Sequence, residues 1–185
     1  MKEILAVVGS PRRGGNTDIL VDAAIAGART AGAVAEKVFL ADLNIAPCCG
    51  CGNCRSRTPG KCCREDDMQE LYGKILAADG MIIGTPVYWW GPSAQLKTFI
   101  DRWYAFLGNK TAGLAGKKIV LICAMGDDDP GTARHISGMF EDIMSYLKME
   151  SAGQLIVTAS AKGEAAENAA ALAEAKGLGL HLAAV

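Results

Sequence analysis

The sequence lacks two features that would assign it to common classes of protein: a long apolar run and an excess of one charge. None of its apolar runs reaches the roughly 18 residues that a membrane-spanning helix needs. Its 19 Lys and Arg residues are balanced by 20 Asp and Glu residues, which gives a net charge of -1. Without a basic surplus the chain has little electrostatic attraction for nucleic acid. We therefore expect neither a membrane nor a nucleic acid as its partner.

The sequence also lacks the glycine patterns that bind common nucleotides. It contains neither the dinucleotide pattern GxGxxG nor a Walker A motif, so neither NAD as a resident cofactor nor ATP is favoured. Histidine is scarce, and neither His135 nor His181 has a visible catalytic partner. We accordingly predict no side chain that acts as a catalytic acid, base or nucleophile.

The sequence does contain enough apolar residues to build a sizeable core. Hydrophobic residues make up 50% of it and the mean hydropathy is +0.17, too apolar for a disordered chain. The length predicts one domain, residues 1–185, with a cysteine-rich loop at 47–63. The apolar stretch Ile4–Val8 is too short for a secretory signal. We therefore expect a cytoplasmic protein, a setting in which thiols stay reduced.

Short apolar runs alternate with amphipathic segments along the chain. The runs predict strands at Ile4–Val8, Val34–Leu40, Met81–Ile83, Ile119–Ala124 and Leu155–Val157. The amphipathic segments predict helices that begin near Asn16, Met68, Pro92, Ile136 and Glu164. This alternation predicts an α/β fold, a three-layer doubly wound sandwich with a five-stranded parallel sheet. Ligands of such folds bind at the carboxyl ends of the strands, which directs attention to the loops 9–17, 85–92 and 125–131.

The first of these loops, Gly9–Thr17, has the composition of an anion site. Its glycines let backbone N–H groups turn toward an anion, and the helix that follows adds a partial positive charge. Ser10, Asn16 and Thr17 can donate hydrogen bonds, and Arg12 can donate a charge-assisted one. The alternative is an ordinary glycine-rich turn in which Asn16 or Thr17 caps the helix.

The second loop, Thr85–Pro92, carries three consecutive aromatic residues on a turn stiffened by proline. Flat apolar side chains beside backbone N–H groups suit a flavin ring, although such aromatics also serve in cores and interfaces. In the third loop, we expect Met125 and Gly126 to border the same ring. The three aspartates that follow them would repel a phosphate, so we interpret them as a solvated charge run.

Two segments, GSPRRGGNT (9–17) and TPVYWWGPSAQLKTFIDRW (85–103), resemble the flavodoxin-like NAD(P)H-dependent FMN reductase family. The resemblance extends over nearly the whole chain and implies the strand order 2-1-3-4-5 and a homodimer or homotetramer. It also implies that the first segment holds the FMN phosphate and that the second surrounds the isoalloxazine ring. The residues carried over are Ser10, Arg12, Asn16 and Thr17 for the phosphate, and Pro86, Val87, Tyr88 and Trp89 for the ring.

Six of the seven cysteines lie within the short stretch from Cys48 to Cys63, which indicates a site. Closely repeated C-x2-C steps favour an iron–sulfur cluster over zinc, whose structural sites usually pair two distant knuckles. Reduced thiols, a redox disulfide and zinc remain alternatives. The segment resembles the iron–sulfur flavoprotein branch of the same family, and this resemblance implies a 4Fe-4S cluster. Its ligands would be Cys48, Cys51, Cys54 and Cys62.

Just beyond the cysteines, Asp66 and Asp67 precede a helical pattern and are interpreted as its N-cap rather than as metal ligands.

Together the features of the sequence predict an FMN-dependent oxidoreductase that uses NAD(P)H or a ferredoxin-type electron donor. It would pass electrons through FMN to a small-molecule acceptor or to the cluster. One alternative is a non-enzymatic electron carrier or redox sensor with the same cofactors. Another is a zinc-stabilised binding module.

Overall fold

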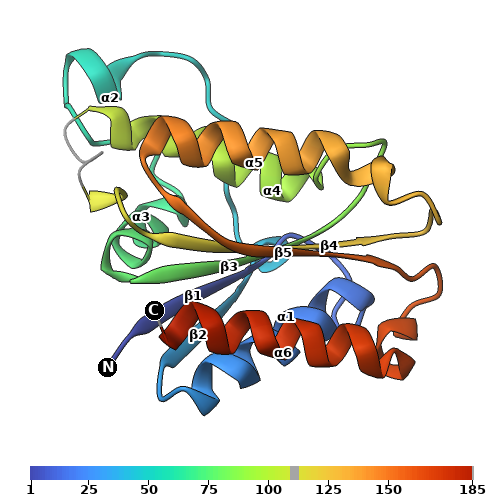
Figure 1. Cartoon of the computed structure of the whole chain (residues 1–185). Helices are drawn as coiled ribbons and strands as arrows, with labels where there is room; N and C mark the ends of the chain where they lie inside the picture. Colours follow the sequence, from blue (N-terminus) through green and yellow to red (C-terminus); the bar gives the residue numbers. More distant parts are fainter. Residues whose placement is uncertain (109–112, 185) are drawn as a thin grey trace.

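A five-stranded parallel sheet runs through the middle of the computed structural model, which describes residues 1–108 and 113–184 (Figure 1). The strands are β1 (Glu3–Val8), β2 (Val34–Phe39), β3 (Gly80–Pro86), β4 (Lys118–Met125) and β5 (Glu150–Thr158). Their order in the sheet is β2-β1-β3-β4-β5, and every neighbouring pair is parallel. The predicted doubly wound fold and its strand order are therefore confirmed.

Helices cover both faces of the sheet and form the two outer layers (Figure 1). Helices α1 (Asn16–Thr30) and α6 (Ala169–Ala184) lie on one face. The other face carries α3 (Met68–Ala77), α4 (Ala94–Asp101) and α5 (Arg134–Leu147). Shorter helical turns are α2 (Asn53–Ser56), η1 (Leu40–Asp42), η2 (Arg102–Leu107), η4 (Pro130–Ala133) and η5 (Glu164–Glu167). Among the described residues, none of these helices is long and apolar enough to cross a membrane.

The central strands read as continuous apolar runs because both of their faces are buried. In β1, Leu5 and Val7 belong to the core under α3, α4 and α5. Ile4, Ala6 and Val8 belong to the core under α1 and α6. The side chains of this run therefore belong alternately to two separate hydrophobic clusters, one on each side of the sheet.

Most element boundaries shift by one to three residues, and two elements differ more from the expectation. Strand β5 begins at Glu150 rather than Leu155, because it is an edge strand whose first half is only partly buried and carries polar residues. The last helix is divided, with η5 ending before Asn168 and α6 beginning after it. The side-chain oxygen of Asn168 accepts a hydrogen bond from the N–H of Ala171, which fixes the start of α6.

Helices α1 and α6 approach so closely at two glycines that their backbones come into contact. A Cβ atom at Gly27 would lie 1.9 Å from the carbonyl oxygen of Lys176, and one at Gly179 would lie 1.8 Å from that of Ala24. Both distances are far below van der Waals contact. The two glycines therefore permit a close approach between the two helices of this layer.

Candidate functional site: a cleft and a cysteine cavity

A cleft with a volume of about 130 Å³ opens at the carboxyl ends of the strands. The loops that follow β1, β3, β4 and β5 form its walls. Nine of the ten residues predicted to bind the cofactor line it, namely Ser10, Arg12, Asn16, Thr17, Pro86, Val87, Tyr88, Met125 and Gly126. Three loops that are distant in sequence therefore converge on one site, where the topology of a doubly wound sheet puts a ligand.

The start of α1 forms the base of this cleft. Gly15 precedes the helix in an extended conformation, and no side chain caps the helix there. The first N–H groups of a helix have no intrahelical partner, so those of Asn16 and Thr17 stay available. Gly14 has a φ of 64°, and a Cβ at Gly15 would lie 2.9 Å from the carbonyl oxygen of Arg12. The glycines thus permit a tight turn that leaves an anion-binding helix end open.

The two adjacent arginines of this loop have different surroundings. The guanidinium of Arg13 pairs with Asp42 and lies 4.4 Å from the ring centre of Phe39. Arg12 lines the cleft and is exposed. A charge-assisted contact to an anion in the cleft is therefore available to Arg12, whereas Arg13 holds the loop against β2.

The side chain of Asn16 is used for structure rather than left free for a ligand. Its Nδ2 donates to the carbonyl oxygens of Ala159 and Ala161, at 2.9 and 2.8 Å. Its Oδ1 accepts from the N–H of Ala165 at 3.1 Å. Sequence reasoning expected this side chain to donate toward the anion, but it ties α1 to the segment after β5. Only the backbone N–H of Asn16 remains for an anion.

The aromatic loop ends in a tight two-residue turn. Tyr88 and Gly91 exchange both backbone hydrogen bonds, at 2.8 and 3.0 Å, and the intervening Trp89 and Trp90 have φ values of 51° and 60°. Two consecutive positive φ values define a type I′ turn, which glycine and asparagine adopt far more readily than tryptophan. Trp89 stands at the corner of the turn, is 90% exposed and does not line the cleft. It is the one predicted cofactor residue that the structure separates from the others.

Buried hydroxyl groups lock the aromatic loop to the first loop. The Oγ of Ser93 donates to the carbonyl oxygen of Gly9 at 2.6 Å and accepts from the N–H of Leu96, which caps α4. The N–H of Ser93 donates to Oγ1 of Thr85 at 3.1 Å. Both hydroxyl side chains are fully buried. The two walls of the cleft are consequently fixed relative to each other.

Sequence reasoning missed the fourth wall of the cleft, which Ala159, Ser160 and Lys162 form after β5. Glu164 holds this segment by accepting hydrogen bonds from the N–H groups of Ser160 and Ala161, each at 2.7 Å. Lys162 adds a second cation to the lining of the cleft, besides Arg12. The strand topology could have indicated this wall, because the fifth parallel strand ends at the same edge of the sheet as the other four.

The aspartate run after β4 folds on itself and faces solvent, as expected. Asp127 accepts from the N–H of Asp129 and from the hydroxyl of Thr132, and these bonds lower the pKa of Asp127. His135 and His181 are also exposed. None of these side chains lines the cleft.

A second cavity, of about 380 Å³, is lined by all six clustered cysteines. Asp101 at the end of α4 and Tyr104 in η2 complete its wall together with Arg64. In Figure 1 the cysteine loop, which contains α2, lies at the end of the molecule away from the carboxyl ends of the strands. From Ser93, which is bonded to Gly9 in the first loop, to Tyr104 in the cavity wall, the chain advances by roughly 18 Å along α4 and η2.

The thiols around this cavity form an outer and an inner group. The sulfurs of Cys49, Cys51 and Cys63 lie within 4.8 Å of one another, and all three residues are exposed. Cys54 is buried and Cys62 half-buried. Of this outer group, only Cys51 is a predicted cluster ligand, whereas Cys49 and Cys63 are not. The positions of the sulfurs therefore do not single out the four predicted ligands among the six cysteines of the loop.

The thiols also differ in their acidity. A hydrogen bond from the N–H of Asn53, joined by one from Cys63, lowers the pKa of Cys51. Burial raises the pKa of Cys54. The seventh cysteine, Cys123, lies in the core on β4, where burial raises its pKa to about 12. The reactive sulfurs are thus confined to the loop.

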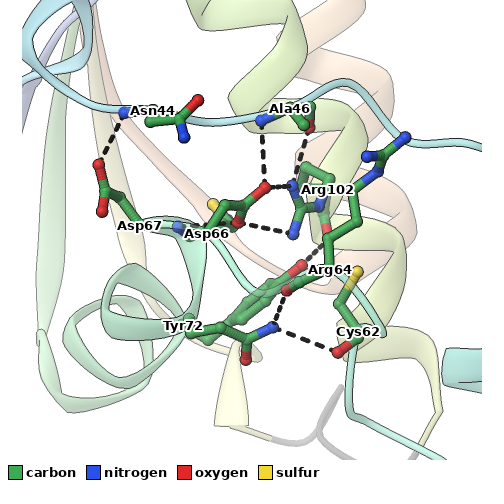
Figure 2. A network of polar contacts seen from close by, with 10 residues as sticks. Asn44, Ala46, Cys62, Arg64, Asp66, Asp67, Tyr72 and Arg102 are labelled. Atoms are coloured by element: carbon green, nitrogen blue, oxygen red, sulfur yellow. Dashed lines mark hydrogen bonds and ion pairs between the residues drawn. The ribbon is translucent and has the colours of Figure 1, made fainter.

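A buried ion pair closes the base of the cysteine loop (Figure 2). The guanidinium of Arg102 donates to both carboxylate oxygens of Asp66, at 2.6 and 3.0 Å, and to the carbonyl oxygen of Ala46 at 2.8 Å. Asp66 also accepts from the N–H groups of Ala46 and Met68. Asp66 therefore accepts from the first N–H of α3, although the N-cap position itself is occupied by Asp67. It also joins the chain before the six clustered cysteines to the chain after them.

Neighbouring contacts complete this network. The hydroxyl of Tyr72 donates to the carbonyl oxygen of Arg102 at 3.0 Å, and the side chain of Gln69 donates to the carbonyl oxygen of Cys62 at 3.2 Å. Asp67 accepts from the N–H of Asn44 at 2.7 Å instead of capping the helix. Both arms of the cysteine loop are thus attached to α3 and η2.

The sulfur-rich cavity suits a soft metal centre by the chemistry of its donors. Arg64 supports this, because its Nε is buried and has no hydrogen-bond partner among the residues described, although the side chain lines the cavity. An N–H without a partner is available to an anionic sulfur cluster. The cleft at the sheet edge, with its open helix end and two nearby cations, suits a phosphorylated ligand. A doubly wound fold with these two sites has the features of a flavin-dependent redox protein.

Comparison with known proteins defines the class further. The family model described as NADPH-dependent FMN reductase matches residues 2–177, and the chain belongs to this family of oxidoreductases. An iron–sulfur flavoprotein of Methanosarcina thermophila is 34% identical over 139 residues, which cover 75% of this chain and 71% of that protein. An iron–sulfur flavoprotein of Methanocaldococcus jannaschii is 43% identical over 100 residues, 54% of this chain. The chain spans only about half (51%) of the length of this second relative.

The fold has close structural counterparts as well. The Trp repressor binding protein of Bacillus subtilis superimposes with a TM-score of 0.73 at 26% sequence identity. The match covers 95% of this chain and 96% of that one, so the similarity extends over the complete sandwich.

Proposed function

We propose that the protein is an NAD(P)H-dependent FMN oxidoreductase that binds FMN in the cleft and a 4Fe-4S cluster in the cysteine cavity. The observation that carries the FMN assignment is the convergence of nine predicted residues from three loops on one cleft. Arg12 and the free N–H groups at the start of α1 would hold the phosphate, and Pro86, Val87 and Tyr88 would lie against the ring. Met125 and Gly126 form the opposite wall. Trp89, at the exposed corner of its turn, would reach the ring only from outside the cleft.

In the cysteine cavity we assign the cluster to the sequence-predicted ligands Cys48, Cys51, Cys54 and Cys62. All four line the cavity, and the Asp66–Arg102 ion pair fixes the two arms that carry the first and the last of them. Bound FMN accepts two electrons as a hydride and can release them one at a time, which is the chemistry needed to join a nicotinamide to a one-electron centre. The chain itself supplies binding, orientation and exclusion of water.

The partners belong to the same proposal. Between residues 43 and 64 the chain carries Arg55, Arg57, Lys61 and Arg64 and no acidic residue, although the whole chain is nearly neutral. Three of these cations are exposed. A local basic surface beside a redox centre favours docking of an acidic, ferredoxin-type electron donor. A small-molecule acceptor, a cytoplasmic location and assembly into a homodimer or homotetramer complete the proposal.

The same basic surface supports the alternative function, an electron carrier that exchanges electrons only with proteins. Steady-state oxidation of NADH or NADPH with quinone, nitro, azo or free-flavin acceptors separates the two functions. Turnover supports the enzyme. Rapid exchange with a reduced ferredoxin, without turnover of any small acceptor, supports the carrier.

The cofactors are tested by anaerobic purification followed by visible spectroscopy and by analysis for iron, sulfide and zinc. We expect flavin bands above a broad absorption and about four iron atoms per chain, the 4Fe-4S stoichiometry. A colourless protein that contains zinc would instead identify a zinc-stabilised module. Flavin without iron after anaerobic reconstitution would remove the cluster and leave the FMN assignment standing.

A further inference from the structure

Two cysteines on opposite arms of the loop lie in contact at the mouth of the cysteine cavity. The sulfurs of Cys51 and Cys63 are 3.4 Å apart, and both residues are exposed. Helix α2 lies between them in sequence. Cys51 is flanked by Gly50 and Gly52, whose φ values are 67° and 69°. A sulfur held between two glycines can move toward its neighbour with little resistance from the backbone.

We propose that Cys51 and Cys63 form a reversible disulfide, a two-electron redox site separate from the FMN cleft. With hydrogen peroxide as oxidant, one thiolate sulfur attacks a peroxide oxygen, the O–O bond breaks and hydroxide leaves, which takes up the thiol proton as water and leaves a sulfenic acid. The second sulfur attacks the first, the S–O bond breaks and water leaves. Two thiols and one hydrogen peroxide thus give one disulfide and two waters. A dithiol reductant returns both thiols by thiol–disulfide exchange.

The geometry favours this pair over the C-x2-C pair of Cys51 and Cys54. Cys54, the partner of Cys51 in that pattern, is buried under the loop, whereas Cys63 is exposed and in contact with Cys51. A disulfide needs the sulfurs at about 2.05 Å, so the two exposed sulfurs must approach by only about 1.4 Å. Cys49 lies within 4.8 Å of both and is the competing partner.

The disulfide has a consequence that rests on the proposed function. Cys51 is one of the four ligands assigned to the cluster, and a sulfur in a disulfide cannot bind iron as a thiolate. Oxidation of the loop and occupation of the cavity therefore exclude each other. The pair would protect the empty site and release it when the cell reduces the disulfide.

The test uses the full chain, treated with hydrogen peroxide, blocked with N-ethylmaleimide and digested with trypsin. Cleavage at Lys37, Arg55, Lys61 and Arg64 gives peptide 38–55 and peptide 62–64, which each contain more than one cysteine. We expect the wild-type protein to yield these two peptides linked, and a dithiol reductant to separate them. The link should persist in the Cys62→Ser and Cys49→Ser variants and be absent from Cys51→Ser and Cys63→Ser.

Two results would overturn the disulfide: a wild-type protein whose loop thiols are all blocked without any link, or a link that survives Cys63→Ser or Cys51→Ser. A second measurement follows iron uptake with ferrous iron and sulfide under argon. The disulfide form should take up at least tenfold less iron than the same sample after reduction. Equal uptake by both forms contradicts the exclusion. A reduced protein that takes up no iron refutes the cluster, while the linked peptides still establish the disulfide.

Discussion

Arg102 and Asp66 form a two-pronged ion pair whose side chains are 0% and 5% exposed, beside Ala46 at the start of the cysteine loop (Figure 2). Burial opposes the ionisation of Asp66, but its hydrogen bonds from Arg102 and from the N–H of Ala46 outweigh this and lower the pKa of Asp66. Burial likewise opposes the charge of Arg102, and its bonds to Asp66 raise its pKa. Both groups therefore stay charged, and the charge of each is balanced by the other.

Replacing Asp66 with asparagine should destabilise the fold by about 3–5 kcal/mol at neutral pH, because the variant leaves the Arg102 charge buried without its partner. Urea denaturation of both proteins measures the difference. Asp67→Asn is the matched control, since the neighbouring Asp67 makes an exposed hydrogen bond to the N–H of Asn44. A loss no greater than that of the control would mean that the ion pair contributes nothing.

The loss of stability caused by Asp66→Asn should depend on pH and should become smaller in acid. The pKa of Asp66 is lower in the folded protein than the value of about 3.9 in an unfolded chain. Its contribution to stability is therefore complete above pH 4, approximately, and is lost as the pH falls through the folded-state pKa. The difference in unfolding free energy between wild type and Asp66→Asn should shrink below that pH. A difference that is constant from pH 7 to pH 3 contradicts this linkage.

The fold could be predicted from the sequence because both of its signals are local. Short apolar runs such as Ile4–Val8 mark strands buried on both faces, and the alternation of strand and helix determines the layers. The Asp66–Arg102 pair could not be predicted, since the two residues are 36 positions apart and only the tertiary structure brings them together. Asp66 also accepts from the first N–H of α3, and that local role concealed the long-range one.

The place of the candidate site could also be predicted from the sequence, whereas the contacts of its side chains could not. Loops that follow strands of a doubly wound sheet must meet at one edge, so residue types in those loops located the cleft. The structural bonds of the Asn16 side chain could not be predicted, because its partners, Ala159, Ala161 and Ala165, lie more than a hundred residues away. The position of the cysteine loop in the fold could not be predicted either, because the loop has no periodicity that would show which way it runs from the sheet.

The backbone contact between α1 and α6 predicts that glycine is required there. Gly179→Ala should destabilise the fold by roughly 1–3 kcal/mol, because its Cβ would lie 1.8 Å from the carbonyl oxygen of Ala24 and the helices must separate. Gly177→Ala, two positions earlier on α6, meets no atom within 4 Å and should stabilise the helix by up to about 1 kcal/mol. Thermal denaturation measures both. Similar changes in the two variants would show that the close approach is not tight.

The strained turn at the aromatic loop predicts that relieving its strain stabilises the fold and weakens FMN binding. Replacing Trp89 and Trp90 with Asn and Gly supplies the preferred type I′ sequence and should stabilise the ligand-free protein by about 1–2 kcal/mol. If the tryptophans serve the flavin site, affinity for FMN should fall in the same variant. Chemical denaturation and FMN titration measure the two effects. A variant that gains stability and binds FMN as tightly as the wild type would exclude both tryptophans from the site.

The adjacent arginines of the first loop provide the most direct test of the phosphate site. Arg12→Ala should weaken FMN binding by about 1.5–3 kcal/mol, the range for hydrogen bonds to charged groups. Arg13→Ala removes the same charge from the next position, but that side chain pairs with Asp42 outside the cleft, so we expect a much smaller effect on affinity. Fluorescence titration of ligand-free protein with FMN and with riboflavin measures both. Riboflavin lacks the phosphate, so its affinity should be insensitive to Arg12→Ala. Equal losses for the two ligands would place the phosphate elsewhere, because Arg12 would then act through the shape of the loop.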